Sequence, residues 1–330
     1  MKLKLLICHN QALPVSLYGG TERIAWDLAK SLSRAGHEVS LLLPPKSRSD
    51  FAKVYSNRDI AFSKRSFFSA FDFVHTFYPV DPNIFNGIPY LTTQQGNAGP
   101  GENLKGNYNF VSKNHAERHG SKTWVYNGLD WDNYPKFQRG SRREKSVHFL
   151  GKASWDVKNL KGAITVSNLT GFFLDVLGGQ RFSRRKPWIH SLSSKVRFHG
   201  EVDNIRKAAT LQKSSGLLFP VIWNEPFGLA VIESLYYGCP VFATPHGSLG
   251  EIVIDERFGC LSPKASELAE AIMTLRYDPE ICHKYALHHF SAEVMAKNYL
   301  SLYSRILDGE TFEVPSTPID KREKMAWINE

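Results

Sequence analysis

The first 43 residues combine a short apolar segment, an amphipathic segment and a second apolar segment, and this order restricts the possible folds. The segment LKLLIC (3–8) predicts a buried strand, TERIAWDLAKSLSRAG (21–36) a helix with one apolar face, and HEVSLLL (37–43) a second strand. A strand–helix–strand unit closes by a right-handed crossover, which makes its two strands parallel. The chain therefore opens with the pattern of an α/β fold.

The same alternation continues along the chain and predicts a second α/β region. Further strands are expected at FDFVHTF (71–77), PYLTTQ (89–94), YNFVS (108–112) and TWVYN (123–127). After a basic linker at 136–145, strands are expected at 146–152, 172–179, 195–202, 216–223 and 240–245, and helices at 159–171, 205–215 and 291–309. We therefore predict two Rossmann-like domains, with ligands bound at strand ends in a cleft.

Composition excludes several classes of protein. The 330 residues are 42% hydrophobic and 22% charged, as in globular proteins. The apolar run at 5–8 is too short for a signal peptide, and no run approaches the length of a membrane span, so a cytoplasmic location is expected. The four cysteines lack metal-ligand spacing. No nucleic-acid-binding module is visible, so nucleic acid is not expected as a partner.

The net charge of +9 is unevenly distributed: residues 1–140 and 141–200 are both basic, and residues 201–330 are acidic. Residues 141–200 carry 12 lysines and arginines against 3 acidic residues. Basic surface there favours an anionic partner, such as a nucleotide or an anionic membrane leaflet. The stretches 139–145 and 181–187 would suit peripheral membrane contact, although solvated loops explain them equally well.

Two acidic residues flank the segment NEPFGLAVIE (224–233). Glu225 follows an apolar strand, and Glu233 falls eight residues later in an apolar helix expected from Leu229 to Tyr237. At about 100° per residue, this spacing returns both side chains to nearly one side of the helix. A helix cap would explain Glu225. A buried Glu233 instead needs a hydrogen-bond donor, and a sugar diol would supply one.

Two lysines and two glycines also follow predicted strands. Lys152 and Lys158 come after the strand at 146–152, where fixed cations would stabilise the negative charge on a departing sugar diphosphate. Gly19 and Gly20 precede the first helix, where a phosphate can approach backbone amides closely. Solvated lysines and a tight turn are the structural alternatives.

These segments together resemble family 4 of the retaining glycosyltransferases, which have the GT-B fold. The matching motifs are LYGGTE, DFVHTF, VYNGLD, FLGKASWDVKN, VRFHGEVDN and WNEPFGLAVIESLYYGCPVFATPHGSLGEIV. The resemblance extends from Leu3 to about Leu307, and the E-P-F-G-L-x-x-x-E signature is its most specific part.

The resemblance assigns the donor-binding residues around this signature. It implies that Glu225 contacts hydroxyls of the transferred sugar and that Glu233 binds the nucleotide ribose. The backbone amides of Phe227, Gly228 and Leu229 would face the sugar and the diphosphate.

Other residues would complete the site in the same way. Lys152 and Lys158 would hold the diphosphate and form the catalytic set with Glu225, with no metal or other cofactor. Gly19 and Gly20 would close over the donor phosphates from the N-terminal domain.

The sequence also departs from the family pattern. Lys152 stands where an arginine is usual, and Gln95 stands where many relatives have a histidine close to the sugar. A glutamine there can still hydrogen-bond a hydroxyl, so Gln95 is predicted to contact the sugar or the acceptor. His75 fits the family's strand-end histidine and is assigned either to a sugar or acceptor contact or to packing.

The predicted domains are an acceptor-side domain at 1–140, a donor-binding domain at 141–307, and a segment at 308–330, including Trp327, that returns to the first domain. The family assignment implies a metal-independent retaining transferase that moves a sugar from a nucleoside-diphosphate sugar to a glycan or lipid-linked acceptor. Bacterial surface polysaccharide or lipopolysaccharide synthesis is the expected pathway. A nucleotide-sugar epimerase or hydrolase, or a non-catalytic nucleotide-binding protein, are the alternatives.

Overall fold

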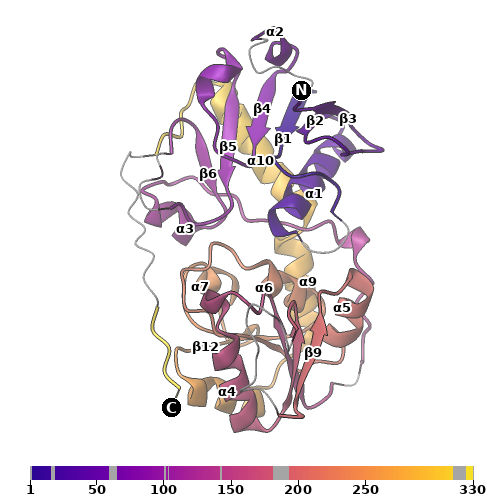
Figure 1. The fold of residues 1–330 in the computed structure, drawn as a ribbon, viewed down its shortest axis with the longest axis vertical. Coiled ribbons are helices and arrows are strands. Elements are labelled where there is room, and N and C mark those ends of the chain that lie inside the picture. The colour runs from indigo at the N-terminus through magenta and orange to yellow at the C-terminus, as the bar shows by residue number, and fades with distance from the viewer. Residues whose placement is uncertain are drawn as a thin grey trace. The chain divides into compact units, whose positions relative to one another are not determined.

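In the computed structural model of the protein, the chain forms two compact units (Figure 1). The structure describes residues 2–15, 19–58, 65–99, 102, 104–141, 143–180, 193–314 and 325–329. Unit 1 comprises Met1–Trp131 and Phe290–Lys321, and unit 2 comprises Asp132–His289 and Arg322–Glu330. The chain therefore enters unit 2 after Trp131, returns to unit 1 at Phe290 and ends in unit 2.

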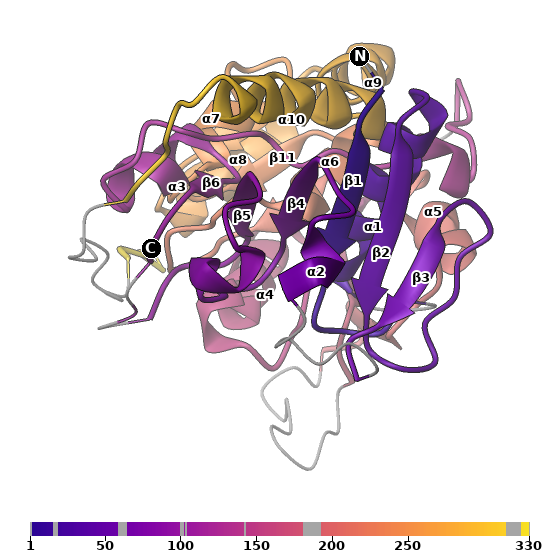
Figure 2. The same ribbon diagram turned by 90° about the horizontal axis from the view of Figure 1, so that it is seen from above.

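Unit 1 contains a six-stranded parallel sheet in the order β3-β2-β1-β4-β5-β6 (Figure 2). The strands are β1 (Lys4–Cys8), β2 (Glu38–Leu43), β3 (Lys53–Ser56), β4 (Phe73–Thr76), β5 (Tyr90–Gln94) and β6 (Tyr108–Phe110). The helices are α1 (Gly20–Arg34), α2 (Arg65–Phe68), η1 (Pro82–Phe85), α3 (Lys113–Arg118) and α10 (Ala292–Leu307), and η2 (Trp131–Asn133) lies at the unit boundary. Strands β1 and β2 are buried along almost their whole length, as expected when both faces of a parallel sheet are covered.

Unit 2 contains a second six-stranded parallel sheet, in the order β12-β11-β10-β7-β8-β9. The strands are β7 (Ser146–Leu150), β8 (Phe173–Leu177), β9 (Val196–Gly200), β10 (Leu217–Phe219), β11 (Val241–Ala243) and β12 (Gly259–Leu261). The helices are η3 (Asp156–Lys158), α4 (Leu160–Thr170), α5 (Asn204–Leu211), α6 (Leu229–Tyr236), α7 (Leu249–Ile252), α8 (Ala265–Thr274) and α9 (Pro279–His289). Within the described ranges, no helix has the length and apolar character needed to cross a membrane.

The two sheets share one topology. If the strands of each unit are counted from its first strand, both sheets have the order third, second, first, fourth, fifth, sixth. This is the order of a doubly wound Rossmann fold, and it reverses between the first and fourth strands. The predicted fold class, α/β with two Rossmann-like parallel-sheet domains, is therefore confirmed.

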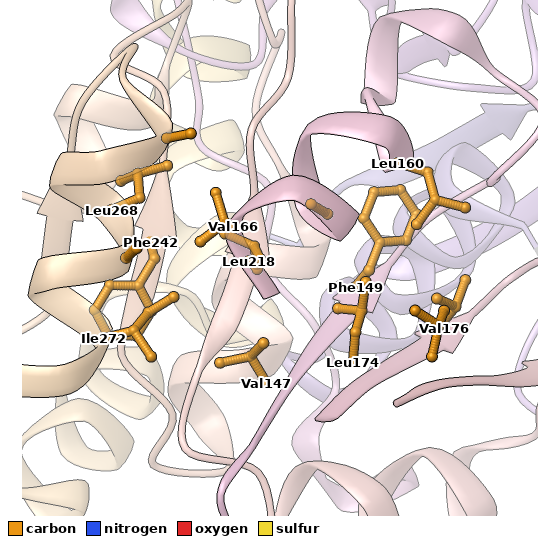
Figure 3. Close-up of a cluster of buried hydrophobic side chains, with 14 of the residues drawn as sticks. Val147, Phe149, Leu160, Val166, Leu174, Val176, Leu218, Phe242, Leu268 and Ile272 are labelled. Carbon is orange, nitrogen blue, oxygen red and sulfur yellow. The ribbon is translucent and has the colours of Figure 1, made fainter. Parts of the chain in front are cut away.

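A continuous apolar cluster holds one face of the unit 2 sheet against α4 and α8 (Figure 3). Its labelled members are Val147, Phe149, Leu160, Val166, Leu174, Val176, Leu218, Phe242, Leu268 and Ile272. Removing this apolar surface from water is the main force that fixes the sheet and its helices. The cluster therefore also fixes the ends of β7 and β10, from which the candidate site is built.

Helix α10 belongs to unit 1, although the sequence placed it in the second domain. It packs against α1 and buries an apolar face that includes Met295, Tyr299, Tyr303 and Ile306. The boundary between the two domains, predicted after residue 140, thus falls after Trp131. The chain returns to unit 1 at Phe290, just before α10, and not at 308 as predicted. The described end of the chain, including Trp327, lies on unit 2 and not on unit 1.

Candidate functional site

The unit 2 site lies at the point where the strand order reverses. Strands β7 and β10 are hydrogen-bonded neighbours, and the chain leaves them toward opposite halves of the sheet. The loop after β7 carries Lys158, and the loop after β10 carries Glu225. Open α/β sheets bind ligands outside the carboxyl ends of the strands at this reversal. The topology therefore brings together two residues that the sequence predicted separately.

Glu225 is the centre of this arrangement. The Lys158 Nζ donates to Glu225 Oε2 at 2.6 Å, and the Trp223 indole Nε1 donates to the same oxygen at 2.8 Å. The Lys158 ammonium also lies 4.9 Å from the ring centroids of both Phe219 and Trp223. The Glu225 and Lys158 side chains are only 8% and 12% exposed, so their pairing is weakly screened by water.

The loop after β11 holds the backbone of Glu225 in place. Gly247 has a φ of 69°, and a side chain there would overlap the backbone N and O of Glu225. Ser248 N donates to the Glu225 carbonyl at 2.9 Å, and Ser248 Oγ donates to the Phe227 carbonyl at 2.7 Å. Because glycine alone fits this close approach without strain, Gly247 is a structural requirement of the site.

Helix α6 begins directly after Glu225, at the residues predicted to face the donor. Gly228 is the N-cap of α6 and has a φ of 96°, a backbone conformation that residues other than glycine rarely adopt. Leu229 is the first helical residue, and Phe227 is buried behind the turn. The turn gives the backbone amides at the start of α6 a positive electrostatic potential beside Glu225.

Glu233, further along α6, is held by two residues that the sequence did not identify. Lys207 Nζ from α5 donates to Glu233 Oε1 at 2.5 Å, and the Tyr134 hydroxyl donates to the same oxygen at 3.0 Å. The Lys207 ammonium also lies 5.1 Å from the Tyr134 ring centroid. Protein donors thus explain how a carboxylate that is 2% exposed is tolerated, and its assignment to a ribose stays a prediction.

Lys152 is not part of the group of side chains around Glu225. Its side chain is exposed, and its ammonium lies 5.2 Å from the ring centroid of Trp155, which is itself 48% exposed. The two predicted diphosphate-binding lysines therefore differ in environment. Lys158 is desolvated and fixed, whereas Lys152 is on the surface at the end of β7.

In unit 1, the predicted glycine pair starts α1. Gly19 is the N-cap with an extended backbone, and its carbonyl accepts a hydrogen bond from Arg23 Nε at 2.9 Å. A side chain at Gly19 would come within 2.9 Å of Val15 Cγ2, so a larger residue there would have to displace the Val15 side chain. Gly20 is the first residue of α1. Residues 16–18, which complete the LYGG motif, lie outside the described residues.

Gln95 and Asn127 form a reciprocal amide pair at the end of β5. Gln95 Nε2 donates to Asn127 Oδ1 at 3.0 Å, and Asn127 Nδ2 donates to Gln95 Oε1 at 2.9 Å. Asn127 is buried and belongs to the VYNGLD motif. The pair therefore fixes the orientation of Gln95, whose predicted contact with sugar or acceptor stays a prediction.

His75 lies in the interior of unit 1. Its Nδ1 is 2.7 Å from the Tyr303 hydroxyl of α10, and its Nε2 is 2.8 Å from Thr93 Oγ1. The side chain is fully buried, and burial lowers the pKa of His75 to about 3. These contacts agree with the packing interpretation of His75.

The buried His75 should make the stability of the protein depend on pH. Between about pH 6.5 and pH 3, the unfolded chain protonates His75 and the folded chain does not, so the free energy of unfolding falls as the pH falls. The contribution of this residue approaches about 1.4 kcal/mol per pH unit. Urea unfolding at pH 7, 6 and 5 should therefore show a shallower pH dependence for His75→Gln than for the wild type. Equal slopes would contradict this.

Comparison with known proteins matches the part of the chain that carries the unit 2 site. Residues 135–287 match the family described as glycosyl transferases group 1. The phosphatidyl-myo-inositol mannosyltransferase of Mycobacterium leprae is 24% identical over 200 residues, which cover 55% of this chain and 53% of that protein. The chain thus spans about half the length of the curated relatives it matches.

Solved structures resemble the fold over nearly the whole chain. A glycosyltransferase involved in avilamycin A biosynthesis has a TM-score of 0.79 at 20% identity, covering 94% of this chain and all of that one. The Anabaena protein HepE, solved in complex with UDP-glucose, has a TM-score of 0.66 at 16% identity, covering 92% of this chain and all of that one. At these identities the likenesses show the GT-B fold, and the family match covers just under half of the chain.

Proposed function

We propose that this protein is a retaining glycosyltransferase that moves a sugar from a nucleoside-diphosphate sugar to an acceptor hydroxyl. The observation that carries the proposal is the Glu225–Lys158 pair at the point of strand reversal in unit 2. A desolvated cation beside a fixed carboxylate suits a ligand that combines a diphosphate with a polyhydroxylated sugar. The family match and the UDP-glucose complex of HepE support the same donor class.

In the proposed reaction, each group around α6 has a separate task. Glu225 accepts hydrogen bonds from hydroxyls of the transferred sugar, and Glu233 accepts those of the ribose diol. The backbone amides of Phe227, Gly228 and Leu229 bind the sugar and the diphosphate at the start of the helix.

The two lysines would stabilise the departing diphosphate. Lys158, which is 2.6 Å from Glu225, provides a fixed positive charge, and Lys152 adds an exposed one from the surface. We propose front-face attack, in which the acceptor oxygen bonds to the anomeric carbon as the bond to the phosphate oxygen breaks. The phosphate then takes the acceptor's proton. The lysines and the helix amides balance the phosphate charge, so the proposed reaction is metal-independent.

We assign the acceptor to unit 1, where Gln95 is fixed by Asn127 beside the end of β5. The acceptor would be a glycan or a lipid-linked sugar of bacterial surface polysaccharide or lipopolysaccharide synthesis. The similarity to an enzyme that mannosylates phosphatidyl-myo-inositol supports a lipid-linked acceptor. We also propose that the enzyme acts in the cytoplasm and touches an anionic membrane through basic residues at 139–145. The second basic stretch, 181–187, lies outside the described residues.

A thermal-shift screen against UDP, GDP, ADP and their sugars tests the proposed donor. A donor present at about 100 times its Kd should raise the free energy of unfolding by about 2.7 kcal/mol. The stabilising donor is then incubated with glycan and lipid-linked acceptors. Transfer with retained anomeric configuration is the expected result. Isomerised or hydrolysed donor without acceptor would favour an epimerase or hydrolase. Binding with no product would favour a non-catalytic protein.

A further inference from the structure

The C-terminal segment Met325–Asn329 contacts the loop that carries Glu225. Met325 N donates to the Ile222 carbonyl at 3.0 Å, and Ile222 directly precedes Trp223, whose indole holds Glu225 Oε2. Ile222 N in turn donates to the Val157 carbonyl at 2.9 Å, next to Lys158. The segment is therefore linked to each side of the Glu225–Lys158 pair through Ile222 and two hydrogen bonds.

The same segment contacts the loop that braces the backbone of Glu225. His246 Nε2 donates to the Ala326 carbonyl at 2.9 Å. His246 directly precedes Gly247, which packs against Glu225, and Ser248, which hydrogen-bonds to it. The Ala326 carbonyl thus fixes the side chain of His246, which directly precedes the two residues that contact the Glu225 backbone.

Trp327 anchors the segment on unit 2. Its ring packs against the apolar cluster beneath α4, and a side chain at Gly162 would come within 2.9 Å of Trp327 Cε2. Ile328 N donates to the Pro263 carbonyl at 2.8 Å, and its carbonyl accepts from Ala265 N at 2.9 Å. Two backbone hydrogen bonds and a partly buried ring therefore hold the segment against unit 2.

We propose that the segment Met325–Asn329 positions the Glu225–Lys158 pair for the transfer reaction by holding the loops after β10 and β11 together. The proposal rests on the proposed function of this pair. No atom of the segment needs to touch the substrate. Its effect passes through Ile222 on one side and His246 on the other.

A chain that ends at residue 324 tests the proposal without any need for a donor. Hydrogen exchange of the Ile222 and Ser248 amides should become at least about tenfold faster than in the full chain, because their loops lose a fixed partner. The amide of Val231, which α6 protects through the Gly228 carbonyl, is the internal control. Unchanged exchange at both loop amides would overturn the proposal, whether or not the protein is a transferase.

Kinetics provides the second arm, in the full chain. Trp327→Ala should lower kcat about tenfold or more, because small displacements of catalytic groups are costly, with a smaller change in the KM for the donor. Trp327→Phe should restore most of the loss. Trp124→Ala, at a partly exposed tryptophan of unit 1, is the matched control and should leave kcat unchanged.

A double variant separates positioning from a general loss of stability. If Trp327 acts through the pair, Trp327→Ala should cost little further activity when Glu225 is already glutamine. Additive losses, or full activity of Trp327→Ala, would overturn the proposal. A wild-type protein that transfers no sugar from any donor would instead overturn the proposed function, and the exchange experiment would still decide the role of the segment.

Discussion

Replacing Lys158 with methionine should lower kcat for sugar transfer by about 100- to 1,000-fold while the protein stays folded. The ammonium of Lys158 belongs to a side chain that is only 12% exposed, and it is bonded to Glu225 Oε2. Methionine keeps an apolar stem over the rings of Phe219 and Trp223 and removes only the charge. The departing diphosphate would then lose its fixed positive partner. Steady-state kinetics with the stabilising donor measures the loss.

Three further variants make the result specific. Glu225→Gln should lower kcat by a similar factor, because it removes the acceptor for the sugar hydroxyls. Lys152→Ala should have a smaller effect, about tenfold, because its charge is exposed and screened by water. Lys161→Ala, at an exposed lysine in the first turn of α4, is the matched control. Full turnover in Lys158→Met would contradict the proposed role of the Glu225–Lys158 pair in sugar transfer.

Replacing Lys207 with methionine should have the largest effect on stability, lowering the free energy of unfolding of unit 2 by about 3 kcal/mol. Lys207 and Glu233 are both buried, with side chains 7% and 3% exposed, and their charges compensate each other. Without Lys207, the Glu233 carboxylate would keep the Tyr134 hydroxyl as a donor but would lose its opposite charge. Thermal and urea unfolding measure the loss, and donor binding should weaken because the proposed ribose ligand is no longer held.

The double variant Lys207→Met/Glu233→Gln provides the decisive comparison. It should be more stable than Lys207→Met alone, because removing the second charge removes the unpaired ion. Tyr134→Phe should cost only about 1 kcal/mol, the typical contribution of one hydrogen bond. If the two substitutions at Lys207 and Glu233 instead destabilised the protein additively, the pair would not be acting as a unit.

Local sequence patterns were enough to predict most of the strands and helices and the residues of the Glu225–Lys158 pair. Glu225 and Lys158 follow apolar strands, and parallel strands place such loops at one edge of the sheet. The sequence around Lys207 also indicates that this lysine is buried. It lies four residues before Leu211 in α5, on the buried side of that helix, where an unpaired lysine would be too costly. Because Lys207 of α5 and Glu233 of α6 are both buried and oppositely charged, an ion pair between them could have been predicted.

Long-range packing could not be predicted in the same way. The periodicity at 291–309 correctly predicts a helix, but an apolar face does not say which sheet it covers, and α10 covers the sheet of unit 1. The apolar segment 123–127, expected to be a strand, forms only an isolated bridge between Trp124 and Phe110. Strand β3, at the edge of the first sheet, is short and half exposed and was not predicted. Tyr134 sits in a loop, where no periodicity identifies partners.

The position of α10 has a consequence for the order in which the protein folds during synthesis. The strands of unit 1 emerge from the ribosome first, but Tyr299 and Tyr303, which bond to Thr93 and His75 in those strands, emerge after nearly all of unit 2. Unit 1 therefore cannot complete its interior while it is being made, although N-terminal domains commonly fold first. During that interval its buried polar network is unpaired and its apolar face is uncovered. Unit 2 in turn receives Trp327 only after α10 has been synthesised, so each unit is completed by a segment that follows the main part of the other.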